Sequence, residues 1–299
     1  MAHPTLLVTG ASGHLGRRVL DLLAGSHPGR LLATTRSPGK LADLAARGVE
    51  LRASSFDDDV AAQAAAFAGA DHVLIISTDA IGQRAEQHRR AIAAAKQAGV
   101  RHIVYTSVTR ADDVTSPLLV TPEHRTTEEA LAQSGVAHTL LRNNWYTDYL
   151  LPPLAQALSS GSLVAAGGQG GAAYVTRDDC ARAAAAALAQ GGSSSRTLEI
   201  SGPAVVTYAE LAAIVSELTG RTIPYVPVTA DQLTRGMIGA GLPPAIAELL
   251  VSFHVAVDRG TLALATSAVA DLTGRPPTSV RDFLVANRAA LTTPPAAAH

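Results

Sequence analysis

Cysteine is almost absent from this 299-residue chain, which contains only Cys180. One cysteine cannot form an internal disulfide, and this is typical of a reducing compartment, so we expect a cytoplasmic protein. The ten histidines show no metal-binding spacing and no H-E-x-x-H motif, so no metal is expected. A run of 18 apolar residues and the basic start of a signal peptide are also missing, so we expect neither a membrane span nor secretion.

An excess of charge of either sign is missing too. The sequence has 24 Lys and Arg residues against 25 Asp and Glu residues, a formal net charge of −1. Nucleic-acid binding depends on basic side chains that neutralise phosphates and so release the counterions of the nucleic acid. Without an excess of basic residues, no nucleic-acid partner is expected. Aromatic residues make up only 4% of the chain, and lysine occurs only as Lys40 and Lys96. Both shortages limit the chemistry that a site can contain.

Short apolar segments alternate with helical ones over about the first 145 residues. Helices are predicted over residues 41–47, 83–98 and 122–134, and a further one starts near Leu15. The predicted strands are residues 5–9, 31–35, 49–53, 72–77, 103–107 and 137–142. Because parallel neighbouring strands need a crossover helix, the alternation predicts an α/β Rossmann-type fold with a doubly wound parallel sheet.

The pattern becomes looser after Trp145. Proline and glycine interrupt the chain, and short strands at residues 197–201 and 224–228 mix with helices at residues 209–218 and 244–257. We therefore divide the chain into a first domain of residues 1–145 and a smaller, mixed C-terminal lobe of residues 146–299. The lobe is expected to be partly interleaved with the sheet, and residues 294–299 are expected to form a frayed tail.

A glycine-rich loop follows the first predicted strand and opens a helix. Gly10 permits a tight turn, Gly13 lets the backbone approach a pyrophosphate, and Gly16 lets the helix pack on the strand. The free N–H groups of the helix N-terminus then attract the anion. The loop therefore predicts that residues 1–145 bind a dinucleotide. Its candidate cofactor contacts are Gly10, Ala11, Ser12, Gly13, His14, Leu15 and Gly16.

The residue twenty places beyond Gly16 indicates which dinucleotide is bound. An Asp or Glu is expected there when the ribose 2′-OH of NAD is recognised, but the sequence has Arg36 and no acidic residue from 31 to 40. A guanidinium can bind a 2′-phosphate with paired hydrogen bonds, whereas a carboxylate would repel it. The sequence therefore favours NADPH over NADH.

The glycine spacing resembles that of the short-chain dehydrogenase/reductase superfamily, whose ordinary members protonate a carbonyl with a Tyr-x-x-x-Lys pair. The residues four places before Lys40 and Lys96 are Arg36 and Ile92, so this motif is absent from the chain. Reduction of a ketone by that tyrosine is therefore excluded.

Several segments carry a narrower resemblance that covers most of the chain. They are residues 9–16, 33–40, 75–83, 94–107, 124–128 and 140–148. In them the chain resembles the atypical, NmrA-like short-chain proteins, and within these most closely bacterial NAD(P)H:quinone oxidoreductase type 2 and triphenylmethane reductase. The resemblance implies a Rossmann fold with a C-terminal lobe, NADPH without flavin, and a quinone as acceptor. The usual adenine-contacting Asp after the third strand falls near Ser55, with acidic residues 57–59 just beyond.

The carboxyl ends of the strands carry further candidates, because ligands of α/β sheets bind there. By similarity, Ser77 and Thr78 should border the cofactor ribose and phosphates, and the backbone around Asn143–Trp145 should hold the carboxamide. The full set of cofactor candidates at these ends is Ser77, Thr78, Thr106, Ser107, Arg142, Asn143, Asn144 and Trp145.

Three aromatic residues lie within five positions, at Trp145, Tyr146 and Tyr149. They are predicted to form a stacking wall for a planar acceptor; the alternative is a core plug between the lobes. His124 either donates a proton to the quinol oxygen or is a structural, hydrogen-bonding histidine. The C-terminal lobe is accordingly the predicted substrate-binding part.

Three functions are compatible with this sequence. The first is an NADPH-dependent, flavin-free oxidoreductase that transfers hydride to a quinone or a similar planar, electron-poor small molecule. The second has the same cofactor but reduces triarylmethane or azo dyes or another carbonyl-type electrophile. The third is a non-catalytic NADP-binding redox sensor, because the loss of Tyr-x-x-x-Lys fits that function equally well. A homo-oligomer is compatible with all three.

Substituting Arg36→Ala tests the cofactor preference. The loss of paired, charge-assisted hydrogen bonds to a 2′-phosphate is expected to lower the ratio of kcat/KM for NADPH to that for NADH by about tenfold or more. An unchanged ratio would show that Arg36 does not select the cofactor.

Overall fold

The computed structural model describes residues 3–292, so the tail predicted at residues 294–299 lies outside the described residues. Its centre is a seven-stranded parallel sheet in the order β3-β2-β1-β4-β5-β6-β9. The strands are β1 (Leu6–Val8), β2 (Leu31–Thr35), β3 (Val49–Ala53), β4 (His72–Ile75), β5 (His102–Val108), β6 (Ala137–Asn143) and β9 (Arg196–Ile200). The predicted α/β class and parallel, doubly wound sheet are confirmed.

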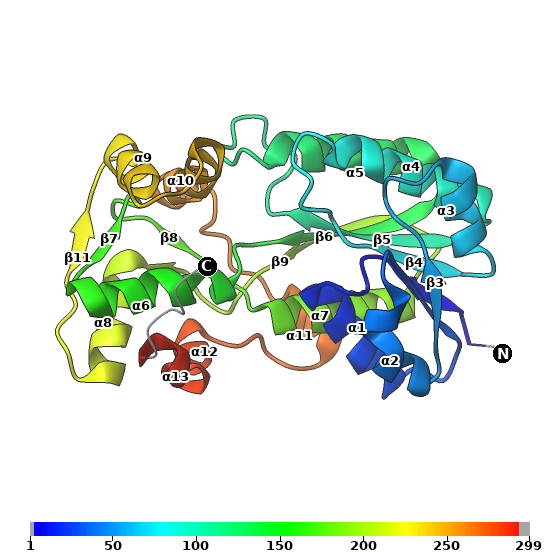
Figure 1. Ribbon diagram of the computed structural model, residues 1–299, viewed down its shortest axis with the longest axis horizontal. Helices are drawn as coiled ribbons and strands as arrows, with labels where there is room; N and C mark the ends of the chain where they lie inside the picture. The colour runs from blue at the N-terminus through cyan, green and yellow to red at the C-terminus, as the bar shows by residue number, and fades with distance from the viewer. Residues whose placement is uncertain (1–2, 293–299) are drawn as a thin grey trace.

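Helices cover both faces of this sheet, and a buried apolar cluster lies on each face (Figure 1). One face carries α3 (Val60–Phe67), α4 (Arg84–Gln97) and α5 (Thr121–Ser134). The other carries α1 (His14–Ala24), α2 (Ala42–Ala46), α7 (Arg177–Gln190) and α11 (Ala268–Thr273). Burial on both faces explains why the strands are continuously apolar.

The order of the strands reverses between β1 and β4. The chain adds β2 and β3 on one side of β1 and then returns to place β4 on the other side. The connections after β1 and β4 therefore diverge onto opposite faces, and a crevice forms at the carboxyl ends of these strands. The glycine loop that follows β1 opens into this crevice.

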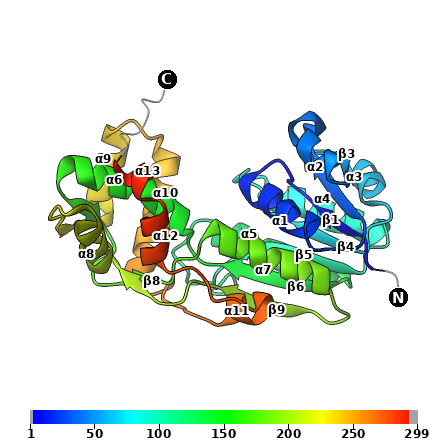
Figure 2. The same ribbon diagram turned by 90° about the horizontal axis from the view of Figure 1, so that it is seen from below.

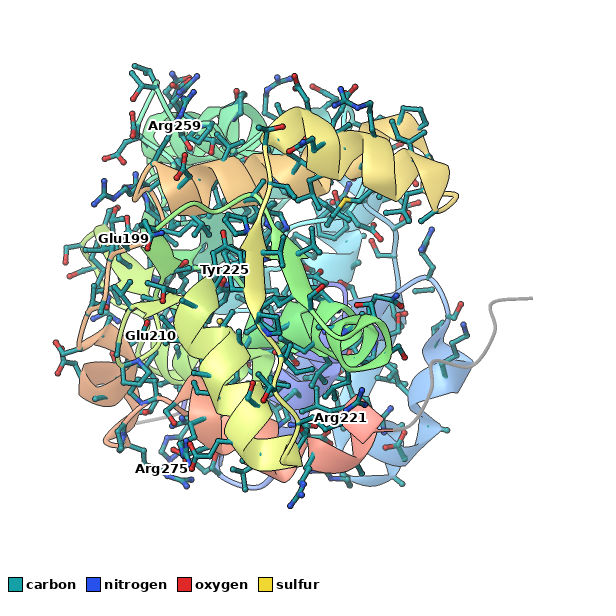
Figure 3. All side chains as sticks on the ribbon, turned by 90° about the vertical axis from the view of Figure 1, so that its left-hand side faces the viewer. Glu199, Glu210, Arg221, Tyr225, Arg259 and Arg275 are labelled. Atoms are coloured by element: carbon teal, nitrogen blue, oxygen red, sulfur yellow. The ribbon has the colours of Figure 1, made fainter. Side chains whose placement is uncertain are left out.

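The C-terminal lobe has its own apolar cluster and lies beside the end of the large sheet (Figure 2). Two small sheets pair β8 (Gly171–Ala172) with β10 (Val206–Thr207), and β7 (Leu163–Ala165) with β11 (Tyr225–Pro227). Figure 3 shows β11, with Tyr225, between α9 and α8. The helices of the lobe are α6 (Leu151–Ser160), α8 (Tyr208–Thr219), α9 (Ala230–Gly239), α10 (Pro244–Asp258), α12 (Val280–Ala286) and α13 (Arg288–Thr292).

Several predicted elements differ from the observed ones. The strand predicted at residues 197–201 is β9, which pairs with β6 and thus completes the large sheet. The helix predicted at residues 41–47 consists of a 3₁₀ turn, η1 (Pro38–Leu41), followed by α2. The strand predicted to reach residue 77 ends at Ile75, because the next amides bond to the hydroxyls of Thr9 and Thr106. Every helix in the described part of the chain is too short or too polar to cross a lipid bilayer.

Substituting Leu74→Ala is expected to lower the free energy of unfolding by about 2–5 kcal/mol, because Leu74 is fully buried at the centre of the sheet. The measurement is urea unfolding followed by circular dichroism. Val114 is 77% exposed, so the matched Val114→Ala control should change the free energy of unfolding by no more than about 0.5 kcal/mol. Equal effects of the two substitutions would contradict the packing described here.

Candidate functional site

A cavity of about 660 Å³ lies at the carboxyl ends of the strands around the reversal point. Loops after β1, β2, β3 and β4 form most of its wall, to which α3, the start of α4, the end of β5 and two tyrosines also contribute. The predicted site residues that line it are Gly10, Ser12, Gly13, His14, Leu15, Gly16, Arg36, Ser77, Thr78, Thr106, Tyr146 and Tyr149. These side chains come from distant parts of the sequence and meet only because parallel strands end at one edge.

The glycine loop has the geometry that an anion requires. Gly10 has a φ of +60°, and a Cβ atom on Gly16 would lie 2.6 Å from the carbonyl oxygen of Gly10. Gly13 is the N-cap of α1 and provides no side-chain acceptor for the amides of the first turn. Those amides therefore point toward the cavity as free donors, which fits a pyrophosphate. Ala11 is buried and does not line the cavity, and its amide donates to the carbonyl oxygen of Thr34.

Arg36 follows β2 directly, is exposed, and lines the cavity. Within residues 3–292 its guanidinium has no ion-pair or hydrogen-bond partner. The adjacent turn is fixed, because the Ser37 amide donates to the Thr35 hydroxyl at 3.1 Å and that hydroxyl donates to Ser12 at 3.1 Å. An unpaired cation on the cavity wall fits a 2′-phosphate.

The three aspartates after β3 have different environments. The Asp58 carboxylate accepts the amide of Ser55 at 2.7 Å, and Asp59 caps α3 by accepting the amide of Ala62 at 2.8 Å. Asp57 lines the cavity and accepts from Gln87 Nε2 at 2.8 Å. Asp57 is thus the one carboxylate of these three that lines the cavity.

The turn after β4 is held by side chains. The Ser77 amide donates to the Thr106 hydroxyl at 2.9 Å, and that hydroxyl donates to the Ser77 hydroxyl at 3.3 Å. The Thr78 hydroxyl donates to Gln87 Oε1 at 2.7 Å. The structure thus brings Ser77, Thr78 and Thr106 together on one wall of the cavity.

The aromatic cluster is divided between two environments. The rings of Tyr146 and Tyr149 line the cavity and stack with centroids 6.0 Å apart, and the Arg177 guanidinium lies 4.6 Å from the Tyr149 centroid. Trp145 instead packs against Phe253 in the C-terminal lobe, at 5.1 Å between centroids. Adjacent residues of an extended segment point to opposite sides, so one side chain faces the lobe and the next faces the sheet.

The comparisons with known proteins agree with this geometry. The profile of the NAD(P)H-binding family matches residues 10–191. The chain is 36% identical to quinone oxidoreductase 2 of Escherichia coli K12, over 93% of this chain and 96% of that protein. The chain belongs to the NAD(P)H-binding, NmrA-like family of atypical short-chain dehydrogenases/reductases.

Solved structures of the NmrA-like family have the same fold. The NADPH complex of the NADPH-dependent quinone oxidoreductase QOR2 from Escherichia coli superposes with a TM-score of 0.90, at 36% identity, over 94% of this chain and 99% of that one. Triphenylmethane reductase from Citrobacter sp., complexed with NADP(H), gives a TM-score of 0.87 at 30% identity, over 94% and 99% of the two chains.

Besides Ala11, five predicted cofactor residues of this NmrA-like chain do not line the cavity: Ser107, Arg142, Asn143, Asn144 and Trp145. Most of their side chains are used within the fold. Ser107 donates to Glu128 at 2.6 Å, Arg142 Nη2 donates to the same carboxylate at 2.6 Å, and Asn144 Nδ2 donates to the carbonyl oxygen of Leu262 at 3.0 Å. A role of the backbone around residues 143–145 toward a carboxamide stays a prediction.

His124 is buried in this structure and does not line the cavity. Its Nδ1 lies 2.8 Å from the Tyr105 hydroxyl, and its Nε2 lies 3.5 Å from the Arg84 guanidinium. Burial, together with the charge of Arg84, holds the pKa of His124 well below its usual range. A neutral, enclosed imidazole favours the structural alternative, and the proton-donor role stays a prediction.

The cavity wall also includes residues that the sequence analysis did not name as candidates, among them Phe56, Gln83, Arg84 and Gln87. Gln83 and Gln87 are four residues apart at the start of the helix predicted from residue 83, so they share one helix face beside the end of β4. That spacing is the signal that would have found them. The described residues contain no group of three or more His, Cys, Asp or Glu side chains placed to hold a metal.

His88 makes the stability of the protein depend on pH. Burial, with the nearby charge of Arg84, lowers the pKa of His88 from 6.5 to about 3 in the folded state. Between these values the unfolded chain binds a proton that the folded chain does not. The free energy of unfolding should therefore fall by about 1.4 kcal/mol per pH unit from this residue as the pH drops below about 6.5.

Urea unfolding of the wild type and of His88→Gln at several pH values between about 7.5 and 4.5 measures this contribution. The free energy of unfolding of the variant should depend less steeply on pH, by about 1.4 kcal/mol per pH unit. Parallel slopes for the two proteins would contradict the assignment.

Proposed function

We propose that this protein is an NADPH-dependent oxidoreductase that transfers hydride directly, without flavin, to a quinone or a similar planar, electron-poor small molecule. The observation that carries this proposal is the joint placement of the glycine loop, the unpaired Arg36 and the stacked tyrosines around one cavity. The complex of the related Escherichia coli quinone oxidoreductase with NADPH supports the choice of cofactor.

The residues assigned to the cofactor divide along the cavity. The first-turn amides of α1 would bind the pyrophosphate, and Arg36 would pair with the 2′-phosphate. Phe56 and Asp57 line the cavity beyond Arg36 and would border the base. Ser77, Thr78 and Thr106, at the ends of β4 and β5, would border the remaining ribose.

A bound nicotinamide supplies a hydride from its C4 position. The protein then has to hold a flat acceptor against that ring and exclude water. Tyr146 and Tyr149 provide a planar surface in the cavity, and burial keeps the Tyr146 hydroxyl protonated by raising its pKa. A quinone accepts hydride with little acid assistance, which fits a chain without Tyr-x-x-x-Lys and with His124 buried.

Two other functions share this site. A reductase of triarylmethane or azo dyes would use the same cofactor and tyrosine wall, and the likeness to triphenylmethane reductase supports it. A redox sensor would bind NADPH without oxidising it, and the absence of the Tyr-x-x-x-Lys motif supports this function.

Mixing the purified protein with NADPH and a small benzoquinone tests these functions. Oxidation measured at the nicotinamide absorbance should exceed the uncatalysed rate, and the rate with the quinone should exceed that with a triarylmethane or an azo dye. A Gly13→Val variant should lose NADPH binding, because its Cβ would lie 3.3 Å from the Gly10 carbonyl oxygen and its side chain would cover the α1 amides. Tight NADPH binding without oxidation of any acceptor would identify a sensor.

A further inference from the structure

His88 of α4 is fully buried, lies outside the wall of the cavity, and is hydrogen-bonded to one of the residues that line it. Its Nε2 is 3.1 Å from the backbone nitrogen of Thr78, a residue that does line the cavity. Its Nδ1 is 3.1 Å from the Thr127 hydroxyl of α5. The imidazole therefore connects the cofactor-facing turn after β4 with a second helix behind it.

The chemistry of these partners determines which ring nitrogen of His88 carries the proton. A backbone N–H can only donate, so Nε2 must present a lone pair to Thr78 and Nδ1 must carry the hydrogen of the neutral ring. Thr127 can accept that hydrogen, because its own hydroxyl proton is donated to the carbonyl oxygen of Glu123 at 2.9 Å. These groups thus form a chain of hydrogen bonds in which the Thr78 amide donates to His88. His88 Nδ1 donates to the Thr127 hydroxyl, and that hydroxyl donates to the Glu123 carbonyl oxygen.

Packing holds the ring in this orientation. The Tyr105 ring approaches His88 edge-on with centroids 5.2 Å apart, and the Phe56 ring does so at 5.9 Å. Burial beside Arg84 keeps the imidazole neutral. In the folded protein near neutral pH, Nε2 can therefore accept the hydrogen bond from the Thr78 amide.

The turn needs this support because it lies beyond the end of β4 and has no strand partner. Arg84 Nε donates to the Thr78 carbonyl oxygen at 2.6 Å, and Arg84 and His88 lie four residues apart on one face of α4. Both polar groups of the Thr78 backbone are thus held by α4, one from each side chain. A loss of either bond would free a backbone segment that faces the cofactor.

We propose that His88 is a positioning residue for cofactor binding, and that Thr127 acts through it by fixing the tautomer whose Nε2 accepts the Thr78 amide. This inference rests on the proposed NADPH site, because Thr78 is the point of contact. Neither His88 nor Thr127 lines the cavity.

The experiment compares NADPH dissociation constants, measured by fluorescence titration, for the wild type, Thr127→Val, His88→Ala and His88→Gln. Thr127→Val preserves the shape of the side chain but removes the acceptor, and should weaken binding about three- to tenfold. His88→Ala should weaken it at least as much. His88→Gln places an amide oxygen near the position of Nε2 and should restore binding to within about twofold of the wild type.

Thr126→Val is the matched control, because Thr126 makes the same type of bond on α5, to the carbonyl oxygen of Pro122, without contacting a histidine. Melting temperatures of all variants separate loss of stability from loss of affinity. A merely structural role of Thr127 would lower the melting temperature of Thr127→Val and leave its NADPH affinity equal to that of the control. That outcome would overturn the proposal.

Nitrogen-15 NMR of the histidine rings gives a readout that is independent of the cofactor. The wild type should show a protonated Nδ1 and an unprotonated Nε2 at His88, and Thr127→Val should show the other tautomer as well. A wild-type ring with protonated Nε2 overturns the inference while leaving the proposed function intact. A wild type with this expected tautomer but without NADPH binding overturns the proposed function, and the positioning role with it.

Discussion

The close approach of α1 to the turn after β1 is the constraint on which the site depends. No Cβ atom can stand at Gly16 without lying 2.6 Å from the Gly10 carbonyl oxygen, and the positive φ of Gly10 turns the chain sharply away from the strand. The helix therefore starts directly at the edge of the sheet, with its free amides in the crevice. Strands β2 and β4 flank this point, so Arg36 and the Ser77–Thr78 turn are placed around the same cavity.

The neighbouring end of β6 has a different physical character. Arg142 is buried there among Glu128, Glu199 and Asp112, and Ser107 adds a further hydrogen bond to Glu128. Arg142 and Glu128 are both buried, so removing one of them would leave an uncompensated charge, whereas Asp112 is exposed. His124 and Glu128, which share α5, both bond within the fold: one contacts Tyr105 and the other Arg142. The polar groups on this side thus bond within the fold and do not line the cavity, whose wall carries Arg36, Asp57, hydroxyls, backbone amides and stacked rings.

How far the sequence predicted the molecule depended on the range of the interactions involved. The six predicted strands of the first domain, its helices at residues 83–98 and 122–134, and the glycine loop all follow from local periodicity and turn chemistry. The strand at residues 197–201 was predicted, but its pairing with β6 could not be, because a strand pattern does not specify its partner. The helices α3 and α7 were not predicted from the sequence. Both are rich in alanine, so their buried and exposed faces differ little in hydrophobicity and leave little periodic signal.

By itself the sequence determined the parallel α/β architecture, the glycine-rich loop and the absence of Tyr-x-x-x-Lys. Each of these depends only on the pattern of residues that are close along the chain. Only the tertiary structure decided that Asp57 lines the cavity while Asp58 and Asp59 bond within the fold, and that Tyr146 lines the cavity while Trp145 packs in the lobe. It likewise decided that His124 is enclosed. The direction in which such a side chain points depends on which distant elements pack around it, and adjacent residues of similar type carry no local signal that distinguishes them.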